Sequence, residues 1–187
     1  MAAQISVFLR TADGPFQQLL MTQNARGHSL VFYEMLHGMA AHDPFAARTD
    51  FPRYVRTAGE IASPVCLFIN RPFAAVNAFF IEALYKEVIK DDCGIVSGIA
   101  VNLRRQVIAS GKAFDIASLF ETEGLAHEVP VASSAFFAVG RELLVAAGGL
   151  SILSPSDMQR AAVRLSEEAQ RQGLRILQTP WAVATAL

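Results

Sequence analysis

The residues best suited to metal chemistry are Glu34 and His37, in the sequence Glu-Met-Leu-His. On a helix this spacing places both side chains on one face, which is what one helix contributes to a carboxylate-bridged di-iron site. Such a site needs a second Glu-x-x-His sequence on a facing helix, and the spacing from Glu123 to His127 is one residue too long. The alternative interpretation is that His37 borders the core and Glu34 is solvated.

The adjacent pair His42 and Asp43 is similar to the metal-binding pair of hydrolases with a His-Asp motif. Pro44 follows directly, however, and Asp-Pro is typical of the start of a helix. The chain contains no phosphate-binding loop, dinucleotide fingerprint or Gly-x-Ser-x-Gly elbow. We therefore expect no catalytic residue, no cofactor and no metal site, and the residues considered for a metal site are Glu34, His37 and His42.

Composition and charge narrow the classes of protein further. Hydrophobic residues make up 52% of the 187 residues and charged residues 18%, so either the core is large or apolar surface faces a partner. A formal net charge of −1 provides no field that favours nucleic acid. No uninterrupted apolar run reaches the length of about 18 residues that spans a membrane. The two cysteines, Cys66 and Cys93, form neither a disulfide framework nor a zinc motif, which predicts a reducing, cytoplasmic compartment.

Capping and stop signals recur along the chain at helical spacing. The longest predicted helix starts at Pro72 and carries an apolar stripe with the helical period. Strand signals are confined to Gln4–Leu9 and the C-terminal end, and Val65–Ile69 is short enough to be either helix or strand. The predicted helices are Phe16–Asn24, Leu30–His42, Arg53–Ala62, Pro72–Lys90, Ser97–Ser110, Asp115–Glu123 and Val131–Ala147.

The C-terminal end has the clearest pattern. Ser154 can cap a helix, a proline follows it at the first helical position, and Asp157 completes a variant of the capping box. Gly173 supplies a left-handed stop after the helix. Two short apolar runs then predict a terminal β-hairpin, Leu174–Leu177 and Trp181–Leu187.

This end resembles the first winged helix of the ESCRT-II subunit that carries a lipid- and ubiquitin-binding domain. The resemblance rests on Leu153–Met158 and Gly173–Ile176, and it covers Ser151 to Leu187. It implies a helix followed by a two-stranded wing. Residues 2–92 have no counterpart in that family, so the resemblance does not extend to endosomal sorting.

Together these patterns predict a mainly α-helical protein. Residues 1–92 are expected to form a helical part, and residues 93–187 a second helical part that ends in a winged-helix-like unit with a short β-hairpin. The expected boundary lies at Asp91–Gly94, where an acidic turn ends the longest helix. A single domain is the alternative.

The apolar content and the lack of a catalytic constellation predict a non-enzymatic subunit of a larger complex, whose function is protein–protein interaction. Its partner would be another protein or a second copy of the chain, and not nucleic acid. Adjacent phenylalanines on a helix cannot both be fully buried, because successive residues lie about 100° apart. The expected interface residues are Phe79, Phe80, Phe136, Phe137 and Trp181. The alternative is a small helical enzyme or sensor that binds a metal or a hydrophobic ligand beside the helix of Glu34 and His37.

Overall fold

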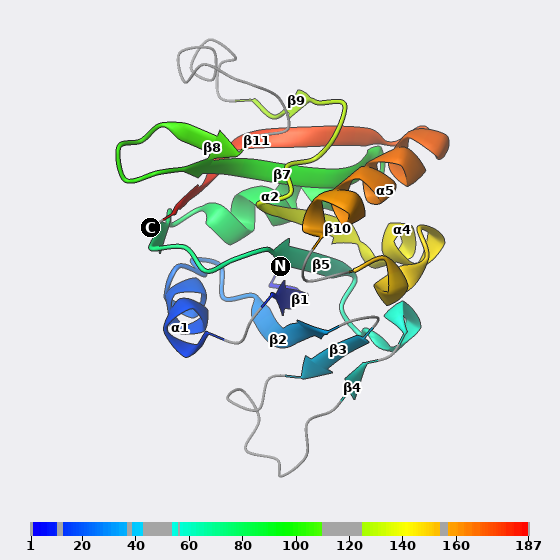
Figure 1. Cartoon of the computed structure of the whole chain (residues 1–187), viewed down its shortest axis with the longest axis horizontal. Coiled ribbons are helices and arrows are strands. Elements are labelled where there is room, and N and C mark those ends of the chain that lie inside the picture. Colours follow the sequence, from blue (N-terminus) through cyan, green and yellow to red (C-terminus); the bar gives the residue numbers. More distant parts are fainter. Residues whose placement is uncertain are drawn as a thin grey trace.

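The computed structural model describes residues 2–10, 13–36, 39–42, 54–55, 57–109, 125–153 and 157–186. Over these residues the chain forms a single mixed β-sheet with helices on both faces (Figure 1). The expectation of a mainly helical protein is therefore wrong. None of the described helices is long and apolar enough to cross a membrane.

Eleven strands and six helical segments make up the described part of the chain. The strands are β1 (Gln4–Leu9), β2 (Ser29–Leu36), β3 (Met39–His42), β4 (Tyr54–Val55), β5 (Val65–Ile69), β6 (Ala75–Val76), β7 (Cys93–Val101), β8 (Val107–Ala109), β9 (His127–Glu128), β10 (Phe136–Gly140) and β11 (Arg175–Thr185). The α-helices are α1 (Gly14–Thr22), α2 (Phe80–Val88), α4 (Arg141–Ala146) and α5 (Met158–Arg171), and the 3₁₀ helices are η1 (Ala58–Glu60) and η2 (Gly149–Ile152).

The strand order along the sheet is β4-β3-β2-β1-β5-β10-β7-β11-β6, with β8 paired to β7 and β9 to β11. Strand β1 is parallel to β2 and to β5, and β7 is parallel to β11. Strand β10 is antiparallel to both β5 and β7, so these two run in the same direction. The chain passes from β1 through α1 to β2 on one side, and later returns to β5 on the other side of β1. The order of the parallel strands therefore reverses at β1.

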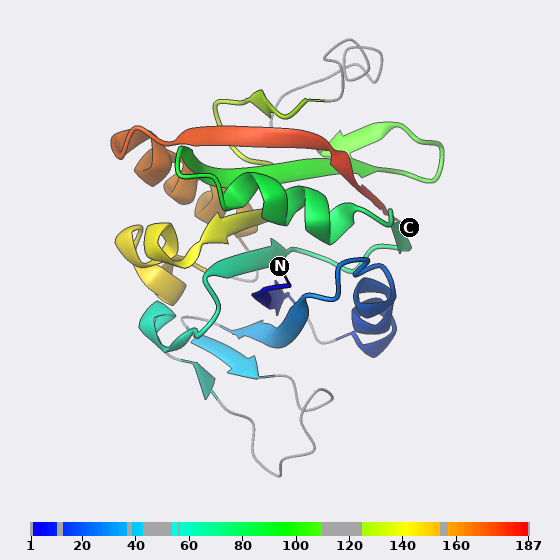
Figure 2. The same ribbon diagram turned by 180° about the vertical axis from the view of Figure 1, so that it is seen from behind.

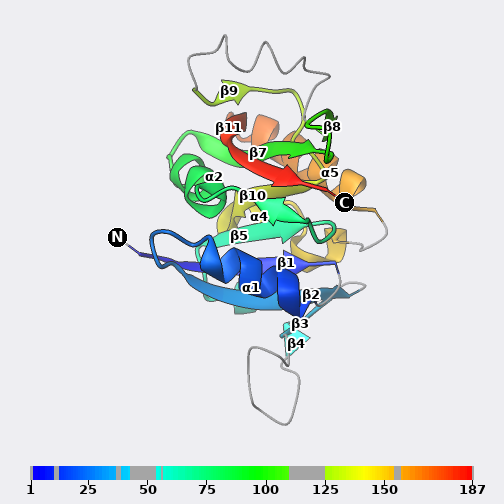
Figure 3. The ribbon, with the colours of Figure 1, turned by 90° about the vertical axis from the view of Figure 1, so that its left-hand side faces the viewer.

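Two apolar layers lie on opposite faces of the sheet. Helices α1 and α2 cover one face, where Phe16, Leu20 and Phe80 pack on inward-facing residues of β1 and β5. Helices α4 and α5 cover the other face, where Leu144 and Leu165 pack on the alternate residues of the same strands. Figure 1 looks onto the α4 and α5 face, and Figure 2 looks onto the face covered by α2. In Figure 3 the sheet lies edge-on between α2 and α5.

Strands occupy several segments for which helices were predicted, and β7 and β10 among them are buried on both faces. Eight of the nine residues of β7 are buried, and a strand with both faces buried is a continuous apolar run without alternation. Such a run has apolar residues at helical spacing as well, so periodicity alone cannot separate the two. The predicted helices that prove wrong are Leu30–His42, which forms β2 and β3, Ser97–Ser110, which lies largely in β7 and β8, and the first half of Val131–Ala147, which contains β10.

Other predicted elements hold in part. The strand Gln4–Leu9 and the helix after Asp13 are confirmed, and Val65–Ile69 is a strand. The helix expected from Pro72 is confirmed only over α2. Arg53–Ala62 contains only β4 and η1 in its described residues, and Asp115–Glu123 lies outside them. The expected domain boundary falls at the turn between α2 and β7, and the strands before and after it belong to the same sheet.

The predicted C-terminal helix is confirmed, but the prediction of a hairpin after it is wrong. Asp157 caps α5 by accepting a hydrogen bond from the Arg160 amide at 2.9 Å, whereas Ser154 lies outside the described residues. Gly173 has φ of +70°, as the stop signal predicted. Beyond it, β11 is one long strand parallel to β7, so the winged-helix expectation is wrong.

A wide bulge, not a turn, interrupts β11. Gln178 pairs with Ser97 and Val183 with Ile99, so residues 179–182 lie opposite Gly98 alone. A β-carbon on Gly98 would lie 2.2 Å from the Ala182 carbonyl oxygen and 2.6 Å from a Phe136 ring carbon. The bulge can therefore form only against a residue without a side chain.

Replacing Gly98 with alanine should lower the free energy of unfolding by about 3 kcal/mol, at the upper end of overpacking effects, because the nearest atom belongs to backbone. Gly140→Ala is the matched control, since a β-carbon there would meet nothing within 4 Å. Urea denaturation followed by circular dichroism measures both variants. Equal stability of the two variants would contradict the packing of β11 on β7.

Candidate functional site

The strongest candidate for a binding site is the edge of the sheet at the carboxyl ends of β1 and β5. Ligands of open α/β sheets bind outside the carboxyl ends of the parallel strands, where the strand order reverses. Here that reversal lies at β1, and the residues that follow the two strands are Arg10, Asn70 and Arg71. The Arg10 amide donates a hydrogen bond to the Ile69 carbonyl at 3.2 Å, so the last residues of β1 and β5 lie next to each other.

Strand alternation sets the direction of these side chains. Leu9 and Ile69 are register partners in the core under α1 and α2. The residue after each of them, Arg10 and Asn70, therefore lies on the opposite face of the sheet, toward α4 and α5. The Asn70 amide donates to the Ala135 carbonyl at 3.0 Å, which ties this edge to the start of β10. Arg10 is exposed and Asn70 is half-buried.

Arg71 is exposed, and an aromatic ring supports its guanidinium group. Its Cζ atom lies 5.9 Å from the centre of the Phe73 ring, a cation–π distance. Phe73 is itself buried and packs edge-on against Phe136, with ring centres 5.7 Å apart. The guanidinium therefore rests on a fixed apolar surface while its N–H groups stay accessible.

Two helices begin on this side of the sheet. Helix α1 follows β1 directly, and α5 ends where β11 begins, so its first turn lies toward the carboxyl ends of the strands. The carboxylate of Asp13 accepts a hydrogen bond from the Phe16 amide at 2.8 Å, and Asp157 caps α5 in the same way. The described carboxylates at these helix starts therefore serve as caps.

The candidates for a metal site do not gather at this edge. Within the described residues no group of three histidine, cysteine, aspartate or glutamate side chains could hold a metal ion. Glu34 lies in β2 opposite Leu9, so the helix that was to carry it with His37 is absent. His37 lies outside the described residues, and His42 ends β3. Glu34, His37 and His42 therefore stay untested as metal ligands.

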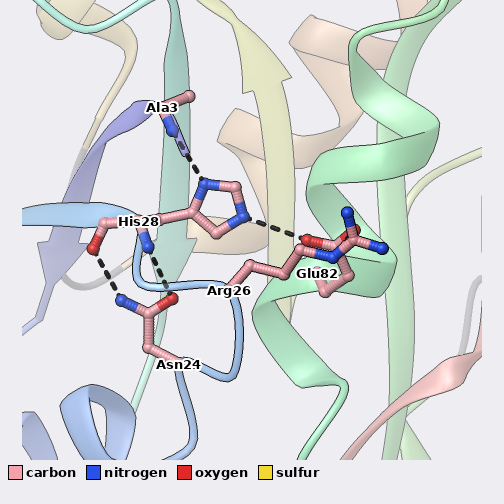
Figure 4. Close-up of polar contacts among 5 residues, drawn as sticks. All are labelled: Ala3, Asn24, Arg26, His28 and Glu82. Atoms are coloured by element: carbon pink, nitrogen blue, oxygen red, sulfur yellow. Dashed lines mark hydrogen bonds and ion pairs between the residues drawn. The ribbon is translucent and has the colours of Figure 1, made fainter. Parts of the chain in front are cut away.

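A histidine that could bind metal or accept a proton is engaged elsewhere. The Ala3 amide donates to Nδ1 of the buried His28 at 3.1 Å, so Nε2 carries the proton and donates to Glu82 Oε2 at 3.0 Å. The Asn24 side chain holds the His28 backbone through two hydrogen bonds, and Arg26 pairs with Glu82 at 3.2 Å (Figure 4). Both ring nitrogens of His28 are thus occupied, and the cluster fastens the loop after α1 to α2.

The cysteines are unsuited to nucleophilic chemistry. Cys66 and Cys93 are free and buried, and burial raises the pKa of each thiol to about 12. The thiolate, which is the reactive form, is therefore scarce at neutral pH.

The five expected interface residues divide into two groups. Phe80, Phe136 and Phe137 are fully buried in the core, whereas Phe79 and Trp181 are 58% and 56% exposed. The two exposed rings line an open hollow of about 370 Å³ between α2 and the bulge of β11. A contact surface at Phe79 and Trp181 stays a prediction.

None of the three residues at the strand ends is among the site residues predicted from the sequence. Asn70, Arg71 and Pro72 were interpreted as the start of a long helix. Two signals pointed to the alternative: Val65–Ile69 is a short run rich in β-branched and aromatic residues, and polar residues follow it directly. That pattern is typical of a buried parallel strand followed by a ligand-binding loop.

Comparison with known proteins bears on the fold alone. No protein-family model matches the chain, and neither does any curated protein. Among solved structures, the chain is similar to GalNAc-T7, crystallised with UDP, GalNAc and Mn²⁺, with a TM-score of 0.62 and 11% identity over 98% of this chain. It is also similar to glucosyl-3-phosphoglycerate synthase from Mycobacterium tuberculosis, in complex with Mn²⁺, UDP and phosphoglyceric acid (TM-score 0.54, 13% identity, all of this chain and 71% of that one). A third is a mycobacterial protein (TM-score 0.52, 15% identity, 99% of this chain and 68% of that one).

These similarities identify the fold as the GT-A fold of glycosyltransferases. The resemblance to an ESCRT-II winged helix is therefore wrong. The expectation of a non-enzymatic subunit of a complex is contradicted as well. The chain spans 43% of the length of GalNAc-T7.

Replacing His28 with alanine should lower the free energy of unfolding by about 2 kcal/mol. The change removes the hydrogen-bond acceptor of the Ala3 amide and one hydrogen-bond donor of the Glu82 carboxylate. Arg26→Ala is the control at the same carboxylate. Its side chain is 64% exposed, so its loss should cost less than about 0.5 kcal/mol. Urea denaturation at pH 7 measures the free energy of unfolding of both variants. Equal losses would contradict a larger contribution from the buried His28 than from the exposed Arg26.

Proposed function

We propose that this protein is an enzyme that transfers a glycosyl group from a nucleoside diphosphate sugar, and that the diphosphate binds at the carboxyl ends of β1 and β5. The observation that carries the proposal is a pair of exposed guanidinium groups, Arg10 and Arg71, at the point where the strand order reverses. The GT-A fold over the chain supports it, since two proteins of similar fold were crystallised with UDP.

The arrangement matches the charge changes of such a transfer. The bond between the sugar's anomeric carbon and the phosphate oxygen breaks, and a bond from an acceptor hydroxyl oxygen to that carbon forms. The hydroxyl proton is lost to a base, and the nucleoside diphosphate leaves with the electron pair of the broken bond. Negative charge therefore grows on the diphosphate, next to guanidinium groups that are always charged.

Asn70 would complement the two arginines. Its side-chain amide can both donate and accept hydrogen bonds, and it is placed on the same face as Arg10. Through its own backbone it is fixed to Ala135, so its position does not depend on the ligand. A polar group held in this way suits the recognition of a ribose or a sugar hydroxyl.

We also propose that the enzyme works in the cytoplasm. Both cysteines are unpaired and buried, which supports a reducing compartment.

Binding of UDP tests the proposed function, because this nucleotide occupies the two solved structures of similar fold. Isothermal titration calorimetry should detect UDP binding to the full chain, and Arg71→Ala and Arg10→Ala should each weaken it about tenfold, the value of a charge-assisted hydrogen bond. Arg164→Ala, an exposed arginine on α5, removes the same charge and should leave affinity within about twofold. Absence of UDP binding, or equal losses in all three variants, would refute the proposal.

A further inference from the structure

We infer that this site neutralises the diphosphate with Arg10 and Arg71 in place of a divalent cation. The inference rests on the proposed function, because it specifies how the proposed nucleotide is held. It departs from both named proteins of similar fold, each of which was crystallised with Mn²⁺ as well as UDP.

The donor set at the strand ends does not fit such a cation. Mn²⁺ prefers carboxylate, carbonyl and water oxygens. The residues that follow β5 are Asn70, Arg71 and Pro72, and Arg10 follows β1. This sequence offers one amide oxygen and two permanent positive charges. A metal ion placed there would meet repulsion from both guanidinium groups, with no described carboxylate among these residues to offset it.

The described carboxylates at the starts of α1 and α5 already accept hydrogen bonds. Asp13 follows Arg10 by three residues, and its Oδ1 atom accepts the Phe16 amide hydrogen. Asp157 binds the Arg160 amide at the start of α5. Binding of a cation by either carboxylate would compete with the cap of its helix. Elsewhere in the described part of the chain, too, no three histidine, cysteine, aspartate or glutamate side chains form a group that could hold a metal ion.

The two arginines are in turn available for an anion. Among the described residues, the arginines that form ion pairs are Arg26, Arg171 and Arg175, and neither Arg10 nor Arg71 takes part in one. Phe73 supports one face of the Arg71 guanidinium and leaves its edge, where the N–H groups lie, open. A planar guanidinium binds two phosphate oxygens at once through that edge.

Calorimetric titration of UDP with and without metal tests the inference. One series contains EDTA and the other contains millimolar Mn²⁺ after removal of the chelator. We expect the dissociation constants to agree within about twofold. Arg71→Lys should weaken binding in both series, because lysine keeps the charge but loses the two-point contact. The Arg10→Ala/Arg71→Ala double variant should not be rescued by Mn²⁺, and Arg164→Ala remains the control.

Direct detection of the metal provides a readout that does not depend on nucleotide affinity. Free Mn²⁺ has a six-line electron paramagnetic resonance signal that weakens when the ion binds protein. Addition of the wild-type protein should leave that signal unchanged, whereas a loss of signal that tracks protein concentration would overturn the inference.

The outcomes separate this inference from the proposed function. Equal UDP affinity in both series supports both. Binding that appears only with Mn²⁺ overturns the guanidinium inference and leaves the proposed function standing. Absence of UDP binding in both series overturns the proposed function, and the inference falls with it.

Discussion

The parallel pairing of β1 with β5 is the constraint on which the rest of this structure depends. Its register runs from Ile5 opposite Val65 to Leu9 opposite Ile69, and both faces of the pair are buried. Parallel neighbours cannot be joined by a tight turn, so the chain must leave the sheet between them. It does so through α1, β2 and the strands beyond, which places the reversal of strand order at β1. The stacked rings of Phe8 and Phe68, 4.8 Å apart, hold the pair together beneath α4 and α5.

The position of the candidate site follows from that pairing. Because the two strands end level, the residue after β1 and the residues after β5 emerge side by side at one edge. Charged side chains are tolerated there because the strand ends reach solvent, whereas both faces of the sheet are apolar. The same geometry explains why so few residues carry the proposed function. Arg10 and Arg71 lie 61 positions apart in the printed sequence, and the register of β1 with β5 brings both to the same end of the sheet.

A second constraint holds the other half of the sheet, where β7 is in close contact with its neighbours. Gly94 lets α5 approach so closely that a β-carbon would lie 2.7 Å from the Ala169 methyl carbon, and Gly98 admits the bulge of β11. The sequence places Gly94 in the predicted turn Asp91–Gly94 and Gly98 in the predicted helix Ser97–Ser110, whereas both are close-contact positions within the buried strand β7. The bulge turns Trp181 outward beside Phe79, which is how the hollow between α2 and β11 arises.

The sequence alone determined the local features that depend on neighbouring residues. Asp13 before α1, the left-handed Gly173 after α5 and the strand Gln4–Leu9 could each be predicted. A helix cap, a helix stop and a short apolar run are each recognised from residues a few positions apart. What the tertiary structure decided was which apolar runs are strands. In Cys93–Val101 and Phe136–Gly140, burial on both faces removes the alternation that marks a strand, so the run has the same pattern as a buried helix. The placement of Arg10, Asn70 and Arg71 at neighbouring strand ends could not be predicted either, because it depends on hydrogen bonds between strands that are distant in sequence.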